Sequence, residues 1–412
     1  MKILIAIILL LPKLVWAESY KITKPGIIFI SKEELIKNID QSNDLNGICN
    51  LENYASYELL GHKADYDLRG AYIGDRILQQ FNPLLKIYCE YIVAKLNGDN
   101  DIQEISNQKI ISAYTKLIET NYLLNFHKDV DNSDHAYTTS HSVIPIMFIY
   151  SLNKQIFSDQ EQKNIENMFL ELIKKNEFAF SEDLVGESTY SNHGLYINNS
   201  RLLYSILVND QDMYNKSVKF FNLLMKKNRT KSGLFRIDSK RGECALHYNL
   251  HNLTPLMSTL WNLKLQGLNF LNDKINGSHT LDEIVSIIIK SVDEPSIVIN
   301  ENKIQGYNQS GRKTCSSDTE TVKVGNDEIR MPYESTMWFS PYYSLSGNKQ
   351  NYENFSKSML SNKYFYDGTV DSNIISYFYK FIYLDPYTKK SIEFDKLGSK
   401  DDLLKELEFA IQ

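Results

Sequence analysis

The chain has 412 residues and a formal charge of −6, from 45 Lys and Arg against 51 Asp and Glu. Hydrophobic residues make up 42% of this length, which is enough to bury a sizeable core. No basic patch interleaved with aromatic residues stands out, so the composition argues against a nucleic-acid-binding protein.

The first residues are typical of a secretory signal peptide. Lys2 precedes an apolar run over residues 3–11, Lys13 follows the run, and Val15 and Ala17 are the small residues of a cleavage site. The run is shorter than the roughly 20 residues of a membrane span, although a retained anchor is the alternative. We expect cleavage after Ala17 and an exported, periplasmic or secreted protein, with no membrane segment left in the mature chain.

Helical patterns dominate residues 18–412, and no Pro/Gly/Ser-rich linker divides them. Two capping boxes, Ser158 with Glu161 and Thr280 with Glu283, each precede an apolar stripe of helical period. Antiparallel helix hairpins in a single all-α domain are therefore expected. The remaining expected helices are 75–96 (kinked at Pro83), 102–125, 137–152, 193–207, 213–227 and 341–360, with a buried stripe over 246–260.

Two segments depart from the helical pattern. Residues 321–330 alternate around Gly325-Asn326, which predicts a short β-hairpin. The Tyr-rich stretch 54–72 predicts a long loop that could serve as a lid. Periodicity alone does not distinguish a ring of helix hairpins from a helical solenoid.

Four cysteines are present: Cys49, Cys89, Cys244 and Cys315. Export would permit a disulfide, and a Cys49–Cys89 bridge is one possibility. Cys244 is expected to be a small buried packing residue. No cysteine or histidine spacing fits a zinc site, so we predict neither a metal nor a cofactor.

Arg241 and Tyr248 are seven residues apart, almost two helical turns, so a continuous helix would carry both on one face. An arginine can clamp a carboxylate with two hydrogen bonds, and nearby positive charge favours the phenolate form of a tyrosine. Together with Asn192 and His193, the pair suits chemistry on a carboxylate-bearing substrate. The alternative is an ordinary surface helix, on which this spacing also occurs.

Several motifs occur in the order found in one enzyme family: Ser191-Asn-His-Gly-Leu-Tyr196, Lys240-Arg-Gly followed by Ala245-Leu-His-Tyr248, Val292-Asp-Glu-Pro-Ser-Ile297, and Met337-Trp-Phe-Ser-Pro-Tyr-Tyr343. From about Cys49 to Tyr343 the chain resembles the alginate lyase family of polysaccharide lyases. The resemblance implies an incomplete α/α toroid, in which helix hairpins surround a deep cleft.

The resemblance also implies catalytic roles. Asn192 and Arg241 would neutralise the carboxylate of a uronate, and His193 would assist them or act as a base. Tyr248 would take the C5 proton and return a proton to the leaving oxygen, which favours mannuronate because both groups then lie on one face of the ring. Further substrate contacts are expected at His247, Lys63, Tyr66, Trp338 and Tyr342, with core packing as the alternative for His247.

The sequence departs from the family at Ser191, where the family has Asn, and at Tyr196, where it has Trp. The stretch 137–141 also lacks a glutamine that some members have. These changes affect the expected substrate preference more than the reaction.

We therefore expect a monomeric alginate lyase acting on an anionic polysaccharide by β-elimination. After signal cleavage the formal charge is −8, from 43 Lys and Arg against 51 Asp and Glu. Such a protein needs a local basic site for its substrate. The alternatives are a lyase for another polyuronate such as glucuronan, or a periplasmic polysaccharide-binding protein with little turnover. A glycoside hydrolase on a similar toroid is less favoured, since no pair of carboxylates is apparent.

Overall fold

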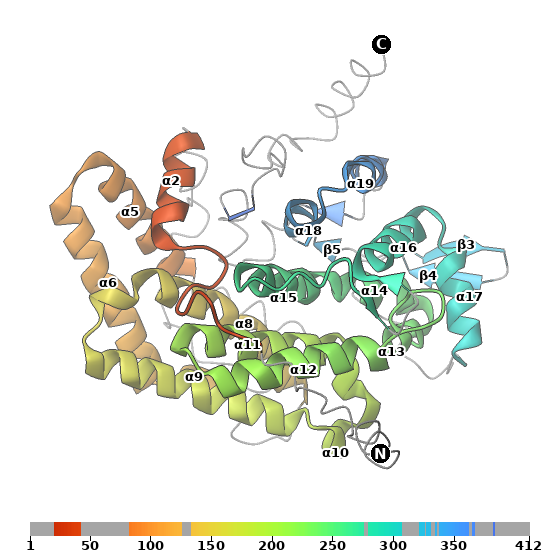
Figure 1. Ribbon diagram of the computed structural model, residues 1–412, viewed down its shortest axis with the longest axis horizontal. Helices are drawn as coiled ribbons and strands as arrows, with labels where there is room; N and C mark the ends of the chain where they lie inside the picture. Colours follow the sequence, from red (N-terminus) through yellow and green to blue (C-terminus); the bar gives the residue numbers. More distant parts are fainter. Residues whose placement is uncertain are drawn as a thin grey trace, which may run out of the picture.

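Helix α11 (Asn192–Val208) lies at the centre of the fold. It packs against α8 (Ser133–Asn153), α9 (Asp159–Ala179), α12 (Gln211–Lys227) and α15 (Leu253–Leu265). In this computed structural model α9, α11 and α12 run side by side, as Figure 1 shows. Because α11 has neighbours on several sides, it buries residues around its whole circumference, including Leu195 and Leu203.

The structure describes residues 20–42, 82–125, 133–275, 279–306, 321–325, 327–330, 334–335, 338–361, 365–366 and 382–383. The predicted signal peptide, the predicted lid at 54–72 and its residues Lys63 and Tyr66 lie outside these ranges. Helices predominate, which confirms the all-α prediction. In the described part, no helix is long and apolar enough to cross a membrane.

The remaining α-helices are α2 (Lys32–Ser42), α5 (Asn82–Asn97), α6 (Asn100–Glu119), α7 (Tyr122–Asn125), α10 (Glu182–Val185), α13 (Arg236–Ser239), α14 (Ala245–His251), α16 (Leu281–Asp293), α17 (Ser296–Ile304), α18 (Phe339–Ser346) and α19 (Lys349–Ser361). Short 3-10 helices are η2 (Lys154–Ile156), η3 (Gly186–Tyr190) and η4 (Gly242–Cys244). The strands are β1 (Lys274–Ile275), β2 (His279–Thr280), β3 (Thr321–Val324), β4 (Asp327–Arg330), β5 (Glu334–Ser335) and β6 (Phe365–Tyr366).

Both predicted capping boxes are confirmed. At the start of α9 the Ser158 hydroxyl accepts a hydrogen bond from the Glu161 amide (3.4 Å), and the Glu161 carboxylate accepts one from the Ser158 amide (2.7 Å). At the start of α16 the equivalent distances between Thr280 and Glu283 are 3.1 and 2.7 Å. Each box satisfies backbone donors that a helix leaves unpaired, so the chain enters both helices at a defined residue.

The N-terminal segment before α2 joins the core through α15. The Asn262 side chain accepts a hydrogen bond from the Phe29 amide (2.8 Å), and the Trp261 indole donates one to the Phe29 carbonyl (2.7 Å). Phe29 is buried and meets Phe148 of α8 edge to face. Residues more than 200 positions apart are thus held together without a strand pairing.

Several predicted boundaries are corrected. Helix α5 spans Asn82–Asn97, and residues 75–81 of the predicted helix lie outside the described residues, so the predicted kink at Pro83 stays a prediction. The predicted helix 102–125 divides into α6 and α7 at Asn121, whose φ is 49°. The predicted helix 341–360 divides into α18 and α19 at Gly347, whose φ is 63°. A residue in left-handed conformation ends a helix in both places.

The β-hairpin prediction is confirmed. Strands β3 and β4 pair antiparallel, with Val324 opposite Asp327, so the turn lies between these two residues as predicted. Gly325 has a φ of 66°, which a tight hairpin turn requires and glycine adopts without strain.

The structure describes two of the four cysteines. Cys89 is a free, buried cysteine, which excludes the Cys49–Cys89 disulfide that the sequence left open. Cys244 is disulfide-bonded, although it is also fully buried as expected.

Candidate active site

Arg241 and Tyr248 lie together, although not on one continuous helix. Their spacing predicts one shared helix face, but Arg241 precedes η4, and Tyr248 belongs to α14. The guanidinium carbon nevertheless lies 4.4 Å from the centre of the Tyr248 ring. This is cation–π geometry, which places the positive charge directly against the phenol.

The chain reaches this arrangement through a turn at Gly242. Its φ of 61° is a conformation that glycine adopts more readily than other residues. The turn lets the backbone pass from Arg241 into η4 and α14 within three residues. The side chain can therefore fold back over the helix that follows.

The Arg241 guanidinium is available to a ligand. Within the described residues it takes part in no hydrogen bond or ion pair, and its side chain is only partly buried. An arginine in this state can offer its planar fork to a carboxylate. By contrast, Arg236, five residues earlier, is occupied by the Glu187 carboxylate at 3.2 and 3.3 Å.

His193 lies at the start of α11 and stacks on Tyr137 of α8. The two ring centres are 4.3 Å apart, and the planes differ by 20°. The Tyr137 hydroxyl in turn forms a 2.7 Å hydrogen bond with Nε2 of His251 on α14. This contact joins the Asn-His motif to the helix that carries Tyr248.

His247 completes the connection along α14. Its ring stands edge-on to Tyr248 at 4.9 Å and stacks on His251 at 5.7 Å. Arg241, Tyr248, His247, His251, Tyr137 and His193 thus form one continuous series of side-chain contacts across three parts of the sequence. Of these six residues, only Arg241, His247 and Tyr248 belong to the same sequence motif, at residues 240–248.

Asn192 is the first residue of α11 and is buried. Its side-chain oxygen has no hydrogen-bond partner among the described residues. A buried carboxamide oxygen without a donor is costly in free energy, and a hydroxyl group of a bound ligand could offset that cost. The close approach of η3 fixes this end of the helix, because a Cβ at Gly194 would lie 1.8 Å from the Thr189 carbonyl oxygen.

The structure removes two residues from the predicted set of substrate contacts. Trp338 and Tyr342 are buried in the core around α18, and Trp338 packs against Phe355 at 4.8 Å. The Tyr342 hydroxyl donates to the Asp282 carboxylate at 2.7 Å. These interior positions leave neither side chain a surface for a sugar, so we do not propose them as substrate contacts.

Tyr137, His141 and His251 were not among the predicted site residues. Tyr137 and His141 lie four apart on α8, as do His247 and His251 on α14, so each pair shares a helix face. Burial, followed by the charge of His251, lowers the pKa of His141 to about 4, so this ring is neutral near pH 7. The i, i+4 spacing of aromatic and histidine residues was a signal that sequence inspection could have used.

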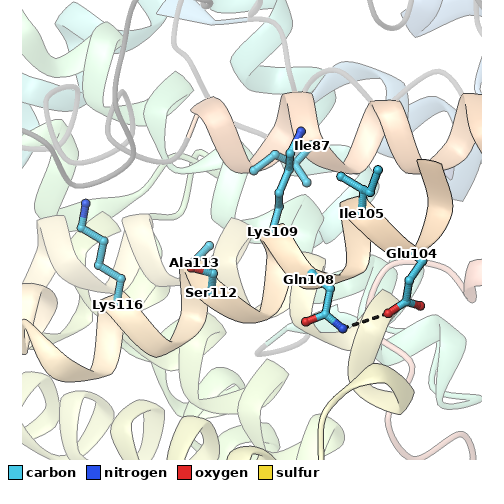
Figure 2. Close-up of a pocket in the computed structure, with 8 residues that line it drawn as sticks. All are labelled: Ile87, Glu104, Ile105, Gln108, Lys109, Ser112, Ala113 and Lys116. Carbon is cyan, nitrogen blue, oxygen red and sulfur yellow. Dashed lines mark hydrogen bonds between the residues drawn. The ribbon is translucent and has the colours of Figure 1, made fainter. Parts of the chain in front are cut away.

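A groove on another part of the surface contains none of these residues. It lies along α6 with Ile87 of α5, and Figure 2 shows Lys109 and Lys116 on its α6 side. Gln108 in this groove donates to Glu104 at 2.8 Å. Among the described residues, no cluster of three His, Cys, Asp or Glu side chains is arranged to hold a metal ion.

Comparison with known structures identifies the fold. The chain is similar to the crystal structure of alginate lyase A1-III from Sphingomonas species A1, with a TM-score of 0.57 and 12% identity over 82% of this chain and 92% of that one. It is similar to an alginate lyase from Bacteroides ovatus, with a TM-score of 0.54 and 11% identity over 86% of this chain and 99% of that one. It is also similar to a tyrosine-to-phenylalanine variant of A1-III complexed with tetrasaccharide, with a TM-score of 0.56 and 12% identity over 81% of this chain and 91% of that one.

These similarities define an all-α protein with the α/α toroid fold of the alginate lyases. Residues 126–298 also match the alginate lyase family, and this range contains Asn192, His193, Arg241 and Tyr248. The match agrees with the resemblance found in the sequence. No curated protein matches the chain in sequence.

Proposed function

We propose that the protein cleaves alginate, with preference for mannuronate-rich stretches, by β-elimination at C4–C5 of a uronate. The observation that carries this proposal is the Arg241 guanidinium, which lies 4.4 Å from the Tyr248 ring centre and has no polar partner among the described residues, within the region that matches the alginate lyase family. A carboxylate-binding cation beside a phenol is what elimination from a uronate needs.

The chemistry begins with the substrate carboxylate. The C5 proton is weakly acidic while the adjacent carboxylate stays ionised, so charge must be neutralised as the enolate-like intermediate forms. Arg241 supplies a fixed positive charge, and the Asn192 carboxamide supplies a hydrogen-bond donor to the same group. Both act most strongly on the charge that develops during proton removal.

Tyr248 transfers the proton. As phenolate it takes the proton from C5, and as phenol it protonates the C4 oxygen as the glycosidic bond breaks. One residue can serve both steps when the C5 proton and the leaving oxygen are on the same face of the ring, which is the geometry of mannuronate. In guluronate the two lie on opposite faces, so His193 would have to act as the second group.

His247 is proposed as a substrate contact beside the reacting sugar, because its ring meets Tyr248 and is only partly buried. Lys63 and Tyr66 remain proposed lid contacts.

The test is absorbance near 235 nm during incubation with poly-mannuronate, poly-guluronate and glucuronan. Elimination creates a double bond conjugated to the carboxylate, whereas hydrolysis and binding do not. We expect the fastest rise with poly-mannuronate. A faster rise with glucuronan would assign the protein to another polyuronate, and no rise with any polymer would exclude lyase activity.

We also propose that the mature protein is an exported monomer comprising residues 18–412. The support is the Lys2 start, the apolar run and the Val15-Trp-Ala17 sequence. Mass spectrometry of protein from the periplasm should give an N-terminus near Glu18. An intact Met1 on protein recovered from the cytosol would contradict export.

A further inference from the structure

Asp238 is a fully buried carboxylate three residues before Arg241. Its Oδ2 accepts hydrogen bonds from the side-chain amides of Asn228 (3.2 Å) and Asn252 (2.9 Å). Its Oδ1 is buried and has no hydrogen-bond partner among the described residues. Burying a carboxylate with incomplete hydrogen bonding is costly, so its presence calls for a physical reason.

The hydrogen bonds of Asp238 connect the two segments that carry Arg241 and Tyr248. Asn252 also donates to the Tyr248 carbonyl oxygen at 2.7 Å, which ties the carboxylate to the end of α14. The Arg241 amide donates to the Asp238 carbonyl oxygen at 3.2 Å, which ties the same residue to the loop before η4. A shift of Asp238 would therefore move the guanidinium relative to the phenol.

Asp238 is also connected to the site by electrostatic interactions with Arg241 and His251. Burial raises the pKa of Asp238, while the positive charge of Arg241, the two amides and His251 act in the opposite direction. Among the described residues, Arg241 and His251 are the charged or titratable groups that act on the carboxylate. His251 is hydrogen-bonded to Tyr137, and Tyr137 stacks on His193. The carboxylate is therefore connected both to Arg241 and, through His251 and Tyr137, to His193.

We infer that Asp238 is a positioning residue: its negative charge and its bonds to Asn228 and Asn252 hold the Arg241 guanidinium over the Tyr248 ring. The inference rests on the proposed function, because it assigns Asp238 to the elimination. Asp238 does not touch the substrate. It balances the positive charge of Arg241 from inside the protein and leaves the outer edge of the guanidinium for the substrate carboxylate.

Asp238→Asn removes the negative charge of this residue while keeping the size and shape of its side chain. The amide oxygen of the new side chain can accept the bonds from Asn228 and Asn252, and its NH₂ would occupy the place of Oδ1, which has no partner to lose. We expect an unchanged or higher melting temperature, because a buried charge is removed. We expect kcat to fall by roughly 10- to 100-fold, since a displaced guanidinium is a poorer fit to the reacting group.

The split between kcat and KM separates positioning from a purely structural role. A displaced guanidinium should lower kcat while the melting temperature and the circular dichroism spectrum stay at their wild-type values. A purely structural role would instead lower the melting temperature together with the activity. Asp282→Asn is the matched control, since Asp282 also accepts two side-chain hydrogen bonds, from Tyr342 and Asn348, but lies in α16. It should leave kcat unchanged.

A double-mutant cycle tests the same charge pairing without any substrate. Arg241→Met should lower the free energy of unfolding in the wild-type background, because it leaves the Asp238 carboxylate buried without its counter-charge. In the D238N background the same change should have a much smaller effect. Additive effects would overturn the inference, as would a D238N enzyme with wild-type kcat. If the wild type shows no absorbance change near 235 nm, the proposed function fails, and the cycle still decides whether the two charges are coupled.

Discussion

Replacing Arg241 with lysine should separate the planar fork of this residue from its charge. The guanidinium lies 4.4 Å from the Tyr248 ring centre and has no partner within the described residues, so its interaction with the substrate carboxylate is not shared with the protein. Lysine keeps the charge but loses the second parallel hydrogen bond. A hydrogen bond to a charged group contributes roughly 1.5–3 kcal/mol, which corresponds to about a 10- to 150-fold loss in kcat/KM.

The assay is the initial rate of absorbance increase near 235 nm on poly-mannuronate over a range of concentrations. Arg236→Lys is the matched control, because the Arg236 guanidinium donates two hydrogen bonds to the Glu187 carboxylate and lies outside the site. It should retain wild-type kcat/KM. An R241K enzyme as active as this control, with an unchanged circular dichroism spectrum, would refute the clamp.

Three further predictions follow from single residues. Tyr248→Phe removes one oxygen and should lower kcat by about 10² to 10⁴ with little change in oligosaccharide binding; a raised KM with normal kcat would instead mean that Tyr248 only binds. The pKa of His141 is lowered to about 4, so the free energy of unfolding should decrease as pH falls from about 6.5 to 4, by at most about 3 kcal/mol. His141→Phe, which keeps an aromatic ring beside Tyr196, should flatten this dependence in urea titrations; an unchanged slope would show that His141 is not responsible. Ser158→Ala removes the cap of α9 and should lower the free energy of unfolding by about 1 kcal/mol, and a loss below a few tenths would contradict the importance of the capping box.

Helix starts could be predicted from the sequence where they depend on residues that are close together in the chain. The Ser158 and Thr280 capping boxes set the starts of α9 and α16, because each depends only on residues three positions apart. Helix breaks were harder to predict. Asn121 and Gly347 interrupt longer helical patterns by adopting positive φ, and an apolar period continues through such a residue without showing the break.

The candidate site shows both the strength and the limit of motif analysis. The motif around Arg241 and Tyr248 brought the correct pair together, but for an incorrect geometric reason, since the guanidinium reaches the ring from a turn at Gly242. Tyr137 and His251 could not be paired from spacing, because their hydrogen bond joins helices 114 residues apart. Trp338 and Tyr342 followed the family motif, but their burial depends on packing between α18 and its neighbours, which the motif does not encode.

The most direct test of the account is the chemical nature of the product. Purified mature protein and its Y248F variant should be incubated with poly-mannuronate and the oligosaccharides analysed by mass spectrometry. The account predicts that the wild type releases fragments with an unsaturated terminal uronate, each one water lighter than a hydrolysis product, and that Y248F releases almost none. Saturated fragments of full mass, or no fragments from the wild type, would contradict elimination by this site.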